Sequence, residues 1–241
     1  MHALLLLSLF SCGPKTADVP PPAGLPTPDA EGSVPDLRIH MTEHFAHLDA
    51  ARWGFVMGDQ AMAARELDWI FSHNNAEDLP EGWHERVADM RRAASAARDA
   101  EDLQGTAAGI AALGASCGSC HAWAGAEVVL PEGPPPPWGE PGLQGHMARH
   151  RWAVDRLWQG LLGPSDDAWA AGLVGLQEMP LGTSDLAGDA EELAHESQAL
   201  ADRVHELSEA GGQAADLDAR AKVYGELLEV CADCHKQVRG L

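Results

Sequence analysis

The chain has 241 residues, enough for one or two domains, and its 45% hydrophobic residues are sufficient for ordinary cores. Thirty-seven acidic residues against 16 basic ones give a formal net charge of −21, and no basic run exists, so nucleic-acid binding is excluded. Ala and Leu are frequent, while Val, Ile and Tyr are sparse, which favours helix over sheet.

The N-terminus carries a short apolar run, residues 3–10, that is too short to span a bilayer. It ends in "LFSC", which resembles a bacterial lipobox, although Phe10 replaces a smaller residue and no Lys or Arg precedes the run. We therefore expect residues 1–11 to be a lipoprotein signal peptide. Cys12 would become the lipidated first residue of an exported protein, anchored to a membrane on the periplasmic side of a Gram-negative-type bacterium. A plain cleaved signal with an incidental cysteine is the alternative.

Two proline-rich segments divide the rest of the chain. Residues 12–35 are predicted to form an extended tether, and residues 127–142, with four consecutive prolines, to form a linker. These breaks define a first domain over residues 36–126 and a second over residues 143–241. The sequence leaves open whether the linker holds the domains apart or lets them pack together.

The two halves repeat each other. Between residues 37–59 and 143–165, at a constant offset of 106 residues, six positions are identical: Leu37 with Leu143, His40 with His146, Met41 with Met147, His44 with His150, Asp49 with Asp155, and Gly54 with Gly160. The motif C-x-x-C-H occurs at Cys117–His121 and again at Cys231–His235, which is 114 residues later. The second half therefore has eight extra residues between its first helix and its motif.

Apolar residues recur every three to four positions between breakers such as Gly58-Asp59 and Gly163-Pro164. This periodicity predicts helices over residues 36–57, 60–74, 82–102, 104–124, 143–162, 165–178, 188–209 and 214–238. No period-2 strand pattern is present. The fold is predicted to be all-α: two tandem antiparallel four-helix bundles, each with a C-x-x-C-H in its last helix.

In a helix, the two cysteines and the histidine of C-x-x-C-H lie on one face, so two thiols can form thioethers to a porphyrin while the imidazole reaches the iron. A zinc site of four cysteines would ignore both histidines and bridge the two domains. A thioredoxin-like dithiol would need a βαβ context. Disulfides within each motif would leave the histidines unexplained. Haem attachment is the favoured interpretation.

Each half resembles the cytochrome c-prime and c-556 group of monohaem four-helix bundles, with the C-x-x-C-H near the end of the fourth helix. The resemblance covers roughly residues 36–126 and 143–238. It implies two covalently bound haem c groups, thioether-linked through Cys117, Cys120, Cys231 and Cys234. It also implies that His121 and His235 are the proximal iron ligands, and that the residue on the opposite side of each iron comes from the first helix of its half.

The repeated "H-M-x-x-H" supplies the distal candidates. His44 and His150 lie near the middle of an apolar stripe and are the favoured ligands; Met41 and Met147 are the alternative, and an open iron position is the third possibility. His40 and His146 are expected closer to solvent. His40 with His44 would also suit zinc, but no third ligand is evident in the sequence.

Other repeated or polar residues carry no assigned role. Asp49 and Asp155 are expected on a solvated helix face, and the remaining histidines do not repeat and are expected at the surface: His47, His73, His84, His195 and His205. The predicted function is electron transfer between periplasmic or membrane-bound redox partners, one of which would have a basic docking surface. A dihaem peroxidase and a gas-binding or gas-sensing haem protein are the alternatives, and no catalytic residue is assigned.

Overall fold

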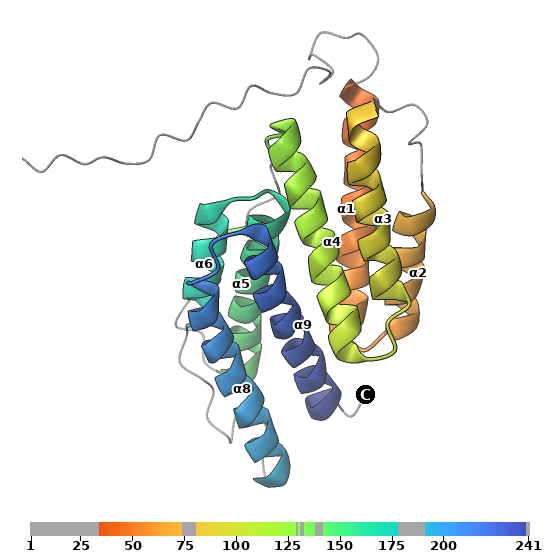
Figure 1. Cartoon of the computed structure of the whole chain (residues 1–241). Coiled ribbons are helices and arrows are strands. Elements are labelled where there is room, and N and C mark those ends of the chain that lie inside the picture. Colours follow the sequence, from red (N-terminus) through yellow and green to blue (C-terminus); the bar gives the residue numbers. More distant parts are fainter. Residues whose placement is uncertain are drawn as a thin grey trace, which may run out of the picture.

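The computed structural model describes residues 34–73, 81–128, 130, 133–137, 142–177 and 191–239. The expected signal peptide, Cys12 and nearly all of the expected tether lie outside the described residues. Everything regular in the described part is helical, without a strand, which confirms the all-α prediction (Figure 1).

The observed helices follow the predicted ones closely. Their bounds are α1 Val34–Val56, α2 Gln60–Ser72, α3 His84–Arg98, α4 Leu103–Ala124, α5 Gly142–Leu162, α6 Asp166–Leu176, α8 Glu191–Gly211 and α9 Leu217–Arg239, with a short 3₁₀ turn, η2, at Glu81–Trp83. The largest difference is in α3, which ends four residues before the predicted end.

Helix starts are set by capping side chains at repeated positions. Asp59 accepts a hydrogen bond from the Met62 amide at 2.8 Å, and Ser165, which lies 106 residues later, caps α6 in the same way. Asp102 caps α4 through the Gly105 amide at 2.7 Å, and Asp216, 114 residues later, caps α9. Asp102 has the extended backbone of an N-cap, so the helix predicted through this residue cannot include it; α3 already ends at Arg98, with Asp99 as its C-cap.

Helices α4 and α9 lie side by side and antiparallel between the two halves (Figure 1). Small residues permit this approach: a Cβ placed on Gly225 would be 3.2 Å from the Cα of Ala108. The buried core is continuous and takes residues from both halves. The proline-rich segment also folds back on α5, where Trp152 donates to the carbonyl of Gly133 and Arg149 to that of Pro137. The halves therefore pack together, and the described part of the linker does not hold them apart.

A polar cluster lies between the halves. The Arg52 guanidinium, only 7% exposed, donates to Asp49 and Asp155, both at 2.6 Å, and to the Tyr224 hydroxyl at 3.1 Å. Trp158, the residue 106 positions after Arg52, stacks on the Tyr224 ring with centroids 5.1 Å apart. Asp49 and Asp155 are partly exposed to solvent, as expected, but the sequence did not reveal that together they neutralise a buried cation.

Among the described residues, no helix combines the length and the apolar character that a bilayer span requires.

Candidate functional sites at the two C-x-x-C-H motifs

The two motifs lie in the last turns of α4 and α9. Because these helices are antiparallel, the motifs lie toward opposite ends of the helix pair (Figure 1). All four motif cysteines are free thiols. Burial raises the pKa of Cys117 and of Cys231 to about 12, well above that of an exposed thiol. Intramotif disulfides are absent here, and the separation of the motifs contradicts a shared four-cysteine zinc site.

Both motif histidines are fixed by a backbone carbonyl. The Nδ1 atom of His121 lies 2.8 Å from the Leu162 carbonyl oxygen, and that of His235 lies 3.1 Å from the Val56 carbonyl oxygen. A carbonyl oxygen only accepts hydrogen bonds, so each Nδ1 must carry the proton. Each ring is therefore oriented through its Nδ1 atom, an arrangement that is common for histidines that bind a metal through Nε2.

The favoured distal histidines share one property in both halves. The Nε2 atoms of His44 and His150 are buried and have no hydrogen-bond partner. Burial, reinforced by neighbouring histidines, lowers the pKa of His44 to about 4 and that of His150 to about 3. Both rings are thus neutral at pH 7. A buried imidazole nitrogen without a partner costs free energy, which iron coordination would remove.

A histidine cluster surrounds His44. One ring nitrogen each of His40, His44 and His73 lie within 4.8 Å of one another. Trp69 stacks on His73 with ring centroids 4.0 Å apart and on His47 with ring centroids 3.7 Å apart. His73 is therefore the third candidate ligand, which the sequence did not reveal.

His73 and His47 were expected at the surface, and both are half-buried, so that expectation is wrong. His47 is held through a 2.6 Å contact between its Nδ1 and Glu66. A signal for His73 exists in the sequence: His44 lies 14 residues before Gly58 and His73 lies 14 residues after Asp59. In an antiparallel helix hairpin with its turn at Gly58–Asp59, the two histidines reach the same level.

The second half differs in detail. His146 is only 4% exposed, so the expectation that it lies close to solvent is wrong. Its ring centroid is 4.1 Å from that of His150. The Nε2 atom of His205 from α8 is buried and has no partner, which overturns its expected surface position, whereas His84 is exposed as expected and His195 lies among residues whose side chains are not described.

The alternative methionine ligands are less enclosed than the histidines. Met41 is 38% exposed, and Met147 is half-buried. In this conformation, His44 and His150 are the first-helix residues that present a buried, unpaired ligand atom.

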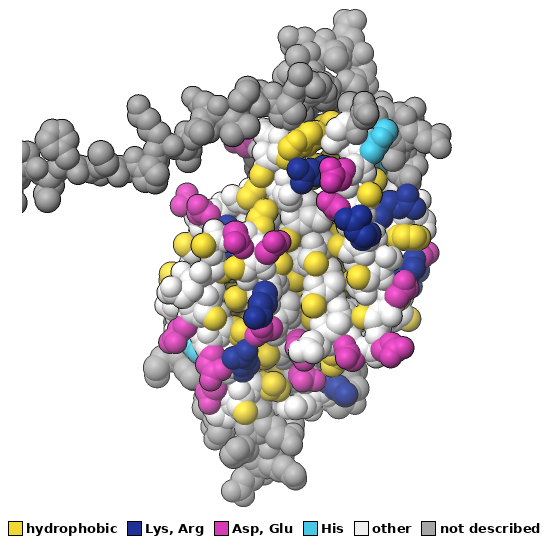
Figure 2. All heavy atoms as spheres, in the orientation of Figure 1, with side chains coloured by type: hydrophobic (Ala, Val, Ile, Leu, Met, Phe, Trp, Pro, Cys, Tyr) yellow, Lys and Arg dark blue, Asp and Glu magenta, His cyan; other side chains and the backbone are white. Residues whose placement is uncertain are grey.

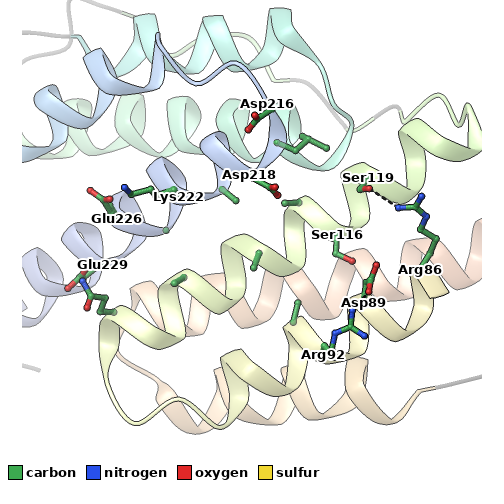
Figure 3. A pocket seen from close by; sticks show the side chains of 18 residues that line it. Arg86, Asp89, Arg92, Ser116, Ser119, Asp216, Asp218, Lys222, Glu226 and Glu229 are labelled. Atoms are coloured by element: carbon green, nitrogen blue, oxygen red, sulfur yellow. Dashed lines mark hydrogen bonds and ion pairs between the residues drawn. The ribbon is translucent and has the colours of Figure 1, made fainter. Parts of the chain in front are cut away.

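A groove of about 1130 Å³ runs beside the first motif between α3, α4 and α9 (Figure 3). Arg86 reaches across it to donate to Ser119, the residue before Cys120, at 3.1 Å, and lies over the Trp123 ring. The motif's cysteines and histidine do not line the groove. Its rim carries acidic and basic side chains together, and the same mixture covers this face of the molecule (Figure 2).

Comparison with known proteins identifies no relative: no protein-family model, no curated protein and no solved structure matches the chain.

Proposed function

We propose that the chain is an electron-carrying dihaem c-type cytochrome. It would consist of two tandem four-helix bundles, the first formed by α1–α4 and the second by α5, α6, α8 and α9. The observation that carries the proposal is the repeated motif geometry. In both halves a C-x-x-C-H lies in the last turns of the last helix, and the Nδ1 atom of its histidine lies within hydrogen-bond distance of a backbone carbonyl oxygen. This donor set fits covalent haem attachment better than it fits a dithiol or a zinc site.

The residues have defined roles in this proposal. The cysteine pairs Cys117 with Cys120 and Cys231 with Cys234 would hold the porphyrin edges, and His121 and His235 would bind the irons. A bound haem would supply one-electron redox chemistry. His44 and His150 would fill the distal positions, because their buried Nε2 atoms have no other partner. Filled distal positions favour electron transfer over peroxide or gas chemistry.

Location and partners remain part of the proposal. A lipid on Cys12 would keep an exported carrier beside its membrane-bound partners. The formal net charge of −21 would favour a partner with a basic docking surface, because opposite charge accelerates encounter.

Distal ligation is tested with single variants of the mature holoprotein. We expect His44→Ala and His150→Ala each to convert one of two haems from low-spin to high-spin in the visible and EPR spectra of the oxidised protein. Met41→Leu and Met147→Leu are the matched controls and should leave both spectra unchanged. Unchanged spectra in the histidine variants would remove these ligands from the proposal, and altered spectra in the methionine variants would assign the distal role to methionine.

Carbon monoxide separates electron transfer from the two rival haem functions. The reduced wild-type protein should resist carbon monoxide, and the His44→Ala and His150→Ala variants should bind it at one haem each. Ready binding to wild type would instead favour a gas-binding protein. Rapid peroxide turnover by wild type would favour a peroxidase.

A second candidate function is divalent transition-metal binding in the first half. The convergence of His40, His44 and His73 favours it, and Trp69 supports the cluster by stacking on His73. Three imidazole side chains suit Zn²⁺ or Cu²⁺. Since His44 cannot bind two metals at once, this site and haem ligation by His44 exclude each other.

Calorimetric titration with Zn²⁺ distinguishes the two candidates. The second candidate would be established if Zn²⁺ bound stoichiometrically to the wild-type holoprotein and changed one haem to high-spin, and if His73→Ala abolished this binding. An absence of binding with both haems low-spin would leave His44 to the iron.

A further inference from the structure

The hydrogen bonds of the two motif histidines cross between the halves. His121 belongs to the first half, yet its acceptor is the carbonyl of Leu162, the last residue of α5 in the second half. His235 belongs to the second half, and its acceptor is the carbonyl of Val56, the last residue of α1 in the first half. Val56 and Leu162 are themselves 106 residues apart, the offset of the repeat. The arrangement is thus reciprocal.

The acceptors are well suited to this role. The last carbonyls of a helix have no partner within the helix, and they form the negative end of its dipole. An imidazole that donates to such a carbonyl becomes a stronger electron donor through Nε2, which stabilises an oxidised iron relative to a reduced one.

Close backbone contact keeps the first acceptor in place. Gly118, the residue after Cys117, lies so near the Leu161 carbonyl that a Cβ at this position would overlap the oxygen. The neighbour is backbone, so it cannot move away as a flexible side chain would. The equivalent residue of the second motif is Ala232, and there the histidine–carbonyl distance is 3.1 Å against 2.8 Å in the first.

We propose that each half positions the iron ligand of the other: the C-terminus of α5 orients His121, and the C-terminus of α1 orients His235. Leu162 and Val56 are positioning residues through their backbone carbonyls. This inference rests on the proposed function, because it assigns the histidines to haem iron. It adds that the two haem sites are completed across the contact between the halves, so that a change in the first helix of one half alters the haem of the other.

The test uses Gly118→Ala in the full-length holoprotein. Attachment should tolerate this alanine, because the second motif already has one at the same position. The added methyl group should push the end of α5 away from His121. We expect the oxidised-to-reduced equilibrium of one haem to move about threefold to tenfold toward the reduced form, which is a rise in potential of up to about 59 mV, while the other haem stays unchanged.

The matched control is Gly109→Ala, which makes the same substitution on the same helix. Gly109 lies against the backbone of Ala97 in α3, within its own half, so its variant should lose stability without a change in either potential. Equal shifts in the two variants, or no shift in Gly118→Ala, would overturn the proposal.

A measurement on the unaltered protein covers the case in which Gly118→Ala does not fold. In paramagnetic proton NMR, both histidine Nδ1 protons should exchange with solvent at least about tenfold more slowly than those of an exposed haem-bound imidazole, because each is held in a hydrogen bond. Fast exchange of both would contradict the proposal. A protein without attached haem has no such signals, so failure of the proposed function is recognised separately.

Discussion

The two halves of the molecule agree in how each motif histidine is fixed, and they differ at the centre of their contact and around the distal histidines. The caps at Asp102 and Asp216 and the carbonyl acceptors of His121 and His235 occupy equivalent positions. At the centre, however, the buried Arg52 has Trp158 as its counterpart, which turns a symmetric contact into an asymmetric one. The repeat thus retains the geometry of two sites while their surroundings diverge.

The largest effect on the haem content of the protein should come from replacing both cysteines of one motif. In Cys117→Ser/Cys120→Ser and in Cys231→Ser/Cys234→Ser, we expect one haem per chain, because each pair would hold its own porphyrin in the proposed cytochrome. Haem quantified by the pyridine haemochrome assay, against protein concentration, should fall to about half in both variants. Loss of all haem in only one variant would show that the halves are not equivalent in attachment.

The central contact should depend strongly on Trp158. Its side chain is 2% exposed and stacks on Tyr224, so Trp158→Ala removes a large buried ring and should cost about 3–5 kcal/mol in the free energy of unfolding. Guanidinium titration measures this loss. Trp53→Ala, at a residue 37% exposed, is the control and should cost about 1 kcal/mol or less. Similar losses at both positions would contradict the central role of Trp158.

Removing the polar interactions of the same contact should cost less free energy of unfolding than removing Trp158. Arg52→Met leaves two carboxylates without their shared cation, but Asp49 and Asp155 are 42% and 46% exposed and regain hydration. We therefore expect a loss of about 2–3 kcal/mol, below the usual cost of breaking a fully buried pair. Arg65→Met, at an exposed residue paired with Glu66, should cost about 0–1 kcal/mol. A stabilised Arg52→Met would mean that the cluster serves specificity rather than stability.

The smallest effects should come from the repeated helix caps. Asp102→Ala and Asp216→Ala each remove one bond to a backbone amide, at 2.7 and 2.8 Å, and each should cost about 1 kcal/mol. Thermal unfolding of both variants would show whether the halves are equal in this respect. A clear difference between them would identify the half that limits stability.

Helix positions and the two motifs were predictable because breakers, periodicity and the internal repeat are local properties of the chain. The central contact was not, because Arg52 with Asp49 three residues before it has the pattern of an ordinary surface pair. Only the packing of the halves brings Asp155 and Tyr224 to the same guanidinium. The carbonyl acceptors were equally hidden, since a backbone group has no sequence signature. The position of His73 beside His44 could have been predicted, because the turn at Gly58 sets the register between α1 and α2.

The most direct test of the account is the intact mass of the mature protein under denaturing conditions, with thiol alkylation, after expression in a bacterial host that attaches haem c. The account predicts a mass increase of two haems and no alkylation at Cys117, Cys120, Cys231 or Cys234. An unmodified mass with all four of these thiols alkylated would contradict it.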